Sequence, residues 1–404
     1  MTGGRRPVHT HVIWQCSEKE GEFVVTEIPT AEAMLAAANL PDELAAGTLP
    51  GLTAALTALG QESGLSADGL ARALAQFEDN LARLAAIAAD RKAHPEIAEV
   101  VIDRPVFILG LPRCGTSILH ALIGADPQVR IPLQWEVAAP SPPPEADSFD
   151  SDPRADGFDA YVAENFTGAW ADVLKAHPIG ARIPQECGMI LETAFQGINP
   201  TMLFRLPSYY SWYRDADTSF GYQVHKMWLQ HLSWKNPRKR WVLKVQEHAF
   251  HLPELMSVYP DAVLVQPHRD PVTVMASISR LIEVIRCVSF AQIDRSALGQ
   301  ELMHLWHDGQ VASMAWRKAN PQIQVHDLRF KDIVADPVTA VRSIYAHADM
   351  DFTPETERAV QGWWDANPAD KHGQHKYELA DYGLTREQVE SVYADYIHAY
   401  GDYL

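Results

Sequence analysis

The sequence predicts an α/β protein in which a central parallel β-sheet is flanked by helices and preceded in the chain by a helical layer. From about residue 104 onward, short apolar runs typical of buried strands alternate with segments of helical periodicity. This alternation favours a parallel, doubly wound sheet. From Thr30 to about Asp90 the composition changes to Ala and Leu at helical spacing, which predicts an amphipathic helical layer.

Local signals predict the individual elements. Residues 11–28 alternate apolar and polar side chains around Gly21, as a hairpin would, and Ser66 is expected to cap a helix. The predicted strands are Val106–Leu109, Trp241–Val245, Ala262–Gln266 and Ile323–Leu328. The predicted helices between them are Thr116–Ile123, His251–Val258, Pro271–Ile285 and Trp306–Ala319.

The chain is long enough for one large or two fused domains. We expect residues 1–100 to form an N-terminal hairpin and helical region packed on the core, and residues 101–404 to form the α/β domain. Residues 138–154 are too rich in proline for regular structure and are expected to form a linker or lid.

Composition excludes several classes of partner. The formal net charge of -18 repels nucleic acids and anionic membranes. The four cysteines lie far apart without a CxxC pair, so neither a disulfide framework nor a zinc ribbon is indicated. No stretch approaches the roughly 18 apolar residues that a membrane-spanning helix needs. We therefore expect a cytoplasmic protein with no membrane span.

A glycine-bounded loop follows the first predicted strand and opens a helix. Its pattern, Gly110-x4-Gly115-Thr116-Ser117, is that of a phosphate-binding loop, except that Thr116 stands where nucleotide triphosphatases have lysine. Backbone N–H groups, the hydroxyls and the helix N-terminus can still hold a phosphoryl-like anion, and Arg113 adds a cation. The loop predicts binding of a phosphate-bearing nucleotide without ATP hydrolysis.

Two further clusters follow predicted strands. Arg269 stands at the end of the third strand, where a guanidinium can hold a phosphate bidentately, and Ser277 lies two helical turns later. Lys244, Glu247 and His248 follow the second strand. These three side chains could provide a cation for a leaving group and a base for an acceptor hydroxyl.

The clusters, in this order, resemble the sulfotransferases that use 3′-phosphoadenylyl sulfate (PAPS), in particular their bacterial branch. The resemblance runs from about Arg104 to the C-terminus and implies a sheet of the P-loop type. The segments that carry it are Pro-Arg-Cys-Gly-Thr-Ser at 112–117, Val-Leu-Lys at 242–244, His-Arg-Asp-Pro-x5-Ser at 268–277, Phe-Lys-Asp-Ile-Val-Ala-Asp-Pro at 330–337 and Lys-His-Gly-Gln-His-Lys-Tyr at 371–377.

The resemblance implies a role for each matching residue. The 5′-phosphosulfate would be held by Arg113, Cys114, Gly115, Thr116 and Ser117. The 3′-phosphate, which the product adenosine 3′,5′-bisphosphate (PAP) retains, would be held by Arg269, Ser277 and a C-terminal loop of Lys371, His372 and Gly373. The chain departs from many relatives at Ile118, where they have a tryptophan that stacks on adenine, and at Phe330, where they have tyrosine.

The catalytic base has more than one candidate. In much of the family the base lies two residues after the lysine, which here gives Gln246, whereas counting back from Arg269 gives Glu247 or His248. We favour His248, because an unperturbed imidazole pKa near 6.5 suits a base at neutral pH, with Glu247 as the alternative. Lys244 and Arg113 would stabilise the leaving oxygen.

The implied reaction is in-line transfer of a sulfuryl group from PAPS to a hydroxyl or amine of a small-molecule or lipid-like acceptor. No metal is expected, because the leaving group is already a stable phosphate anion. Residues 138–235 would form the lid and the acceptor-binding insertion, with aromatic walls and with Glu186 near the substrate. The alternatives are a P-loop small-molecule kinase and a non-catalytic nucleotide-binding module. A homo-oligomer is compatible with the sequence.

Overall fold

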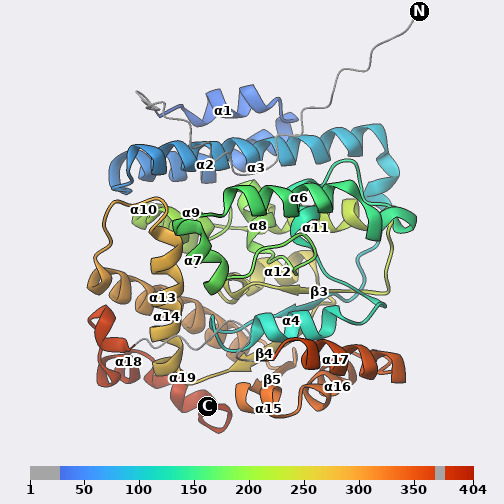
Figure 1. The fold of residues 1–404 in the computed structure, drawn as a ribbon, viewed down its shortest axis with the longest axis vertical. Coiled ribbons are helices and arrows are strands. Elements are labelled where there is room, and N and C mark those ends of the chain that lie inside the picture. The colour runs from blue at the N-terminus through green and yellow to red at the C-terminus, as the bar shows by residue number, and fades with distance from the viewer. Residues whose placement is uncertain (1–27, 369–377) are drawn as a thin grey trace, which may run out of the picture.

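The computed structural model describes residues 28–368 and 378–404. Its centre is a five-stranded parallel sheet with the order β2-β3-β1-β4-β5. Figure 1 shows helices above and below this sheet, which confirms the predicted α/β class. The strands are β1 (Val106–Ile108), β2 (Val129–Arg130), β3 (Arg240–Lys244), β4 (Val263–His268) and β5 (Val325–Arg329).

The four predicted strands are confirmed with ends shifted by one or two residues. The sequence prediction missed β2, because a strand of two residues has no periodicity to detect. Successive side chains along a strand point to opposite faces of the sheet. Val106 and Ile108 belong to the cluster under α4 and the C-terminal helices, whereas Phe107 belongs to the larger core on the other face.

The N-terminal helices form the layer predicted for residues 30–90. They are α1 (Ala31–Ala38), α2 (Asp42–Glu62), α3 (Ala67–Ala93) and the 3-10 helix η1 (Pro95–Glu99). As predicted, Ser66 caps α3, where its side chain accepts a hydrogen bond from the backbone N–H of Gly69 at 3.0 Å. Figure 1 shows these helices in blue, stacked on the green helices that follow β2. The predicted hairpin at 11–28 lies almost entirely outside the described residues.

Short helices fill the chain between β1 and β3. They are α4 (Thr116–Gly124), α5 (Gln134–Ala138), η2 (Ala146–Ser151), α6 (Pro153–Asn165), α7 (Ala169–Ala176), α8 (Gly188–Leu191), η3 (Glu192–Ala194), α9 (Asn199–Phe204), α10 (Pro207–Asp215) and α11 (Ser219–Ser233). The expectation of no regular structure over 138–154 was partly wrong. The 3-10 helix η2 lies within it, and α6 begins with Pro153 at its first turn, where the missing N–H costs nothing.

The remaining helices complete both faces of the sheet. They are η4 (Gln246–Ala249), α12 (Leu252–Val258), α13 (Pro271–Arg286), α14 (Arg295–Ala319), α15 (Phe330–Ala335), α16 (Pro337–His347), α17 (Pro354–Ala366), η5 (Leu379–Tyr382), α18 (Arg386–Val392), α19 (Ala394–Tyr400) and η6 (Gly401–Tyr403). The helix predicted from Trp306 begins eleven residues earlier, at Arg295, because the Asp294 side chain caps that end.

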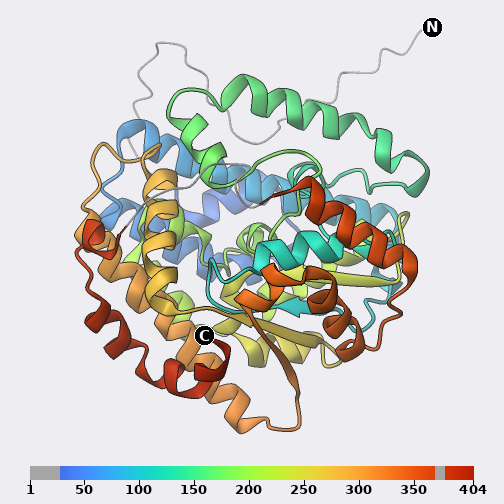
Figure 2. The ribbon, with the colours of Figure 1, turned by 60° about the horizontal axis from the view of Figure 1, so that its bottom comes forward.

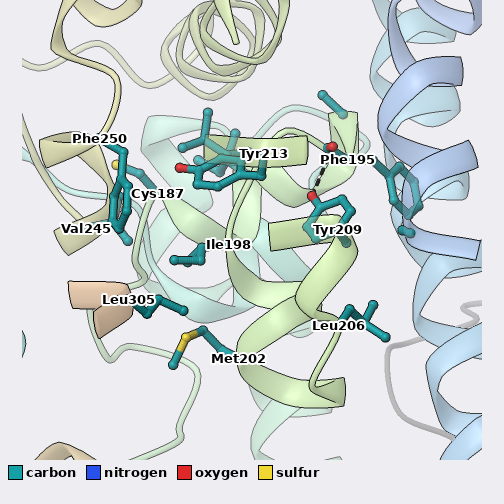
Figure 3. Close-up of a cluster of buried hydrophobic side chains, with 14 of the residues drawn as sticks. Cys187, Phe195, Ile198, Met202, Leu206, Tyr209, Tyr213, Val245, Phe250 and Leu305 are labelled. Atoms are coloured by element: carbon teal, nitrogen blue, oxygen red, sulfur yellow. Dashed lines mark hydrogen bonds between the residues drawn. The ribbon is translucent and has the colours of Figure 1, made fainter. Parts of the chain in front are cut away.

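One hydrophobic core joins the N-terminal helices to the α/β part, since it includes Leu52 and Phe77 from the first and Leu243 and Leu264 from the second. Figure 3 shows part of it, with Phe195 next to the N-terminal helices and Val245 and Phe250 on the opposite side. The Tyr209 hydroxyl donates hydrogen bonds to the carbonyls of Phe195 at 3.1 Å and Gly197 at 2.7 Å. A smaller cluster beneath α6 includes Trp135 and Phe158.

Candidate active site

The loop after β1 has the backbone that its glycines predict. Gly110, Arg113 and Gly115 all have positive φ, at 109°, 63° and 97°. A Cβ on Gly115 would lie 2.9 Å from the Phe330 ring, and one on Gly110 would lie 2.8 Å from a backbone carbonyl oxygen. Glycine therefore meets both the conformational and the steric demand at these positions, and α4 begins directly after the loop at Thr116.

The carboxyl ends of β1, β3, β4 and β5 meet at one edge of the sheet, because all their pairings are parallel. The loop after β1 contributes Arg113, β3 ends at Lys244, Arg269 follows β4 and Phe330 follows β5. Ligands of open α/β sheets bind at this edge. One residue from each of the three sequence clusters, Arg113, Lys244 and Arg269, is thus brought to this edge.

The two arginines are held by the loop and by α13. Arg113 donates from Nε to the Ser277 hydroxyl at 3.0 Å. Arg269 donates to the backbone carbonyl of Arg113 at 2.9 Å, and its guanidinium lies 4.2 Å from the centre of the Phe330 ring. Phe330, which stands where many relatives have tyrosine, therefore orients Arg269 by a cation–π contact.

Lys244 connects β3 to the loop and to the insertion. Its ammonium donates to the Ser117 hydroxyl at 3.0 Å and forms an ion pair with Glu186. Gln246 donates to the Thr116 hydroxyl at 3.2 Å. The hydroxyls of Ser117 and Thr116 are thus in contact with polar groups from the end of β3 and the start of η4.

Glu186 reaches this position because its segment runs beside the end of β3. The N–H of Cys187 donates to the Lys244 carbonyl at 3.0 Å, and that of Gln185 donates to the Pro132 carbonyl at 2.8 Å. Burial favours the neutral acid, but the Lys244 ammonium and the nearby His177 outweigh it and hold the pKa of Glu186 below its ordinary value. A partly buried carboxylate, with 26% of its side chain exposed, is therefore present opposite the loop.

The structure places His248 and Glu247 away from the cavity. His248 is fully buried: Nδ1 lies 2.9 Å from the Tyr222 hydroxyl and its ring packs edge-on against Phe107. Burial, with a smaller effect of His225, lowers the pKa of His248 well below its ordinary value. Glu247 is also fully buried and accepts from the Ile198 N–H at 3.0 Å. Neither belongs to the described residues that line the cavity.

Two other groups of expected site residues remain, Cys114 and the C-terminal loop. Cys114 is buried in the loop, where its thiol donates to the Leu111 carbonyl at 2.7 Å, and burial raises its pKa to about 12. Cys114 therefore packs inside the loop and stabilises its shape. The expected C-terminal loop of Lys371, His372 and Gly373 lies outside the described residues.

A cavity of about 440 Å³ connects these groups to an apolar interior. Its polar end includes Arg113, Thr116, Ser117, Glu186 and Arg269. Of the aromatic residues in the insertion, Trp170 and Phe204 line it, whereas Tyr209, Tyr213 and Trp228 are buried in the core. Side chains of α6 and of the residue that follows it also line the cavity: Phe158, Tyr161, Val162 and Phe166.

Sequence reasoning missed the contribution of the N-terminal layer to this cavity. Arg72, Gln76 and Arg83 line it from α3, and the Gln76 amide donates to the buried Glu192 carboxylate at 3.1 Å. The available signal was a set of polar side chains at helical spacing within an otherwise apolar helix face. The described residues contain no group of three or more His, Cys, Asp or Glu that could hold a metal ion. Nor do they contain a helix long and apolar enough to cross a membrane.

Comparisons with known proteins agree with this site. The signature of the sulfotransferase family matches residues 105–354. Omega-hydroxy-beta-dihydromenaquinone-9 sulfotransferase Stf3 of Mycobacterium bovis is 26% identical over 321 residues, covering 76% of this chain and 77% of Stf3. The crystal structure of sulfotransferase STF1 from Mycobacterium tuberculosis has 29% identity and a TM-score of 0.80, covering 91% of this chain and 99% of STF1.

Sulfotransferase STF9 from Mycobacterium avium has 25% identity and a TM-score of 0.81, covering 93% of this chain and 97% of STF9. The family match covers more than half of the 404 residues and includes the loop, Lys244 and Arg269. Sulfo transfer is thereby favoured over the kinase and the non-catalytic module. The chain is an enzyme that transfers sulfo groups, and it belongs to the sulfotransferase family.

Proposed function

We propose that this enzyme transfers a sulfuryl group from PAPS to a hydroxyl group of a lipid-like acceptor. One observation carries the proposal: Arg113, Ser117, Lys244 and Arg269 from three strand ends line or contact the polar end of a single cavity whose other walls are mainly apolar. The cations suit an anionic donor, and the apolar walls suit an acceptor with little charge.

The residues present fit a donor with two anionic ends. Arg269 and Ser277 would hold the 3′-phosphate, and the loop N–H groups, Thr116 and Ser117 would hold the 5′-phosphosulfate. The positive φ values of Gly110 and Gly115 support this, because they shape a backbone cradle of the kind that binds phosphates. When bound, the donor supplies a sulfuryl group on a phosphate leaving group.

We assign the base to Glu186 in place of His248 or Glu247. A general base must come within hydrogen-bond reach of the proton that it removes. Glu186 lines the cavity beside Lys244, whereas His248 and Glu247 are enclosed by protein. His177 lines the same cavity, and its pKa is lowered by burial, an effect that Glu186 partly opposes. We propose that His177 positions the acceptor.

The proposed step is a displacement at sulfur. The acceptor oxygen forms a bond to sulfur as the bond between sulfur and the phosphate oxygen breaks, and Glu186 takes the acceptor proton. Lys244 and Arg113 stabilise the negative charge that develops on the leaving oxygen, in the way that preorganised cations act in phosphoryl transfer. The products are the sulfate ester and PAP.

The acceptor class is supported by two findings. The cavity walls beyond the polar end are mainly apolar and aromatic. In addition, the relative Stf3 is named for a dihydromenaquinone, a lipid-like acceptor with a terminal hydroxyl. A hydroxyl on an apolar body satisfies both, so we propose this class for the present enzyme.

Titration calorimetry with PAP tests the donor site. We expect binding by the wild-type enzyme and a loss of about 10- to 150-fold in affinity for Arg269→Ala, because a charge-assisted hydrogen bond contributes about 1.5–3 kcal/mol. Arg386→Ala is the matched control, since the Arg386 side chain is 59% exposed and pairs only with surface Glu390 among the described ion pairs. Absence of PAP binding by the wild-type enzyme would contradict the proposal.

A further inference from the structure

The apolar part of the cavity follows one face of α13. Ile278, Leu281, Ile282 and Ile285 line it at the i, i+3, i+4 and i+7 positions, and Val288 continues the series just beyond the helix end. Residues at this spacing lie on a single side of a helix. Leu281, Ile285 and Val288 are only half-buried, so this apolar face is open to the cavity rather than closed by packing.

Two other helices form the walls on either side. Met202, Leu203 and Phe204 line the cavity from α9, and Trp170 and Val173 line it from α7. Both α7 and α9 pack against α13, and Figures 1 and 2 show α7 beside α13. The three helices therefore enclose an apolar groove that continues from the polar end of the cavity. We call it the α13 groove.

The two ends of the α13 groove differ in chemistry. At one end, Ser277 directly precedes Ile278 and accepts from Arg113. At the other end, the Arg72 guanidinium of α3 donates to the Val288 carbonyl at 2.5 Å, and both residues line the cavity together with Ser289. Apolar side chains thus dominate the wall between the end near Arg113 and a polar far end.

The length of the groove follows from helix geometry. Ile278 and Val288 are ten positions apart, and at about 1.5 Å per residue this corresponds to roughly 15 Å. A fully extended alkyl chain advances about 1.25 Å per carbon, given C–C bonds of about 1.5 Å. About twelve carbon atoms would therefore span the groove.

We propose that the acceptor is a linear aliphatic alcohol and that the α13 groove selects its chain length, with Ile285 and Val288 as the residues that set the limit. The inference rests on the proposed function, because the hydroxyl must reach the donor. Each CH₂ group that enters the groove should raise kcat/KM about three- to fourfold, the ratio that its transfer from water provides. The gain should stop where the chain reaches Arg72, because further CH₂ groups would meet a charged side chain.

The test measures kcat/KM with PAPS for linear primary alcohols of about six to about sixteen carbons. We expect a maximum near about twelve carbons for the wild-type enzyme. Ile285→Trp should move the maximum to chains about three to five carbons shorter by filling the far half of the groove. Ile285→Ala, which opens the same space, should move it to longer chains. Val101→Trp is the control, since Val101 is 82% exposed and lies outside the cavity lining.

The outcomes separate this inference from the proposed donor. If PAP does not bind to the wild-type enzyme, the proposed donor is wrong, and the proposed function is contradicted independently of the α13 groove. If PAP binds normally but no alcohol in the series is sulfated, or if kcat/KM does not depend on chain length, a linear aliphatic acceptor is excluded. If the maximum is the same in both Ile285 variants and in the wild-type enzyme, the α13 groove does not select length. PAP affinity measured for each variant shows whether it has folded.

Discussion

At the scale of single residues, the partly buried Glu186 and the fully buried Glu247 have opposite electrostatic environments. Glu186 is paired with Lys244, which keeps its pKa low and its carboxylate charged. Glu247 is fully buried, and burial raises its pKa to about 8, with smaller contributions from Glu192 and Glu186. The same residue type therefore provides a charged carboxylate in the cavity and a largely neutral acid in the core.

Replacing Glu186 by Gln should lower kcat by about 10²- to 10⁴-fold, because general base catalysis contributes that much. The affinity for PAP should stay within a few-fold of wild type, since the amide can still accept a hydrogen bond from Lys244. Sulfation rates at saturating PAPS, combined with calorimetry, check both. Glu145→Gln is the control, because Glu145 also pairs with a lysine but on the surface. Wild-type turnover by Glu186→Gln would exclude this residue as the base.

Replacing Glu247 by Gln should remove a pH dependence of stability between about pH 4.5 and 8. Burial raises the folded-state pKa of Glu247 from 4.5 to about 8. The stabilisation that the folded protein gains from keeping Glu247 protonated is complete below about pH 4.5. It decreases as the pH rises and is lost once the pH has passed about 8. The wild-type enzyme should lose up to a few kcal/mol across this window relative to Glu247→Gln. Urea unfolding at both pH values measures the difference, and exposed Glu78→Gln should behave as wild type.

At the scale of elements, close backbone approach fixes how the N-terminal layer meets the rest of the molecule. Gly51 of α2 faces Phe195 just after η3, and a Cβ at Gly51 would lie only 2.0 Å from the Phe195 carbonyl oxygen. Gly69 of α3 similarly faces the Ser289 carbonyl beyond α13. Both contacts let helices pack directly against backbone, which places α3 next to the cavity.

Gly51→Ala should therefore destabilise the protein by about 3 kcal/mol, because the new methyl group overlaps a backbone atom that cannot turn away. Gly157→Ala is a matched control within α6, where a Cβ would have no neighbour within 4 Å. That variant should be unchanged or more stable by about 0.5–1 kcal/mol, the intrinsic preference of alanine in a helix. Denaturant midpoints give both values. Equal stability of the two variants would contradict the close packing of α2.

At the scale of the whole molecule, a buried polar cluster joins the N-terminal layer to the cavity walls. Glu192, which is fully buried, accepts from Gln76 of α3 at 3.1 Å and from Asn199 of α9 at 2.8 Å. The Arg83 guanidinium lies 3.9 Å from the same carboxylate. Burial raises the pKa of Glu192, an effect that Arg83 partly opposes. The N-terminal helices are therefore part of the same folded unit as the site.

Glu192→Ala should destabilise the whole protein by about 3–5 kcal/mol, since it leaves the buried Arg83 charge without its partner. Glu192→Gln should cost clearly less, because the amide keeps oxygen and nitrogen atoms near Gln76 and Asn199. A single cooperative unfolding transition, shifted in both variants, would show that the two regions unfold together. Loss of only an early, minor transition would contradict that.

Much of the fold and part of the site could be predicted from local sequence signals. Apolar runs mark strands, and glycines mark the loop that needs positive φ, because both effects act within a few residues. Arg113, Lys244 and Arg269 could be expected together, since the carboxyl ends of parallel strands share one edge. The sequence also placed Glu186 near the substrate, but its ion pair with Lys244 could not be predicted, because the two residues lie 58 positions apart and Glu186 is on an irregular segment. That the His248 side chain points into the core could not be predicted from the sequence either.

The sequence by itself determined the α/β class, the glycine-bounded loop after the first strand and the family, because these depend on short motifs and on periodicity. Only the tertiary structure decided which carboxylate lines the cavity beside Lys244 and how far the apolar groove extends along α13. It also showed that α3 lines the cavity. These features depend on packing between segments far apart in the chain, and the burial and charge that set the chemistry of each side chain arise only when that packing forms.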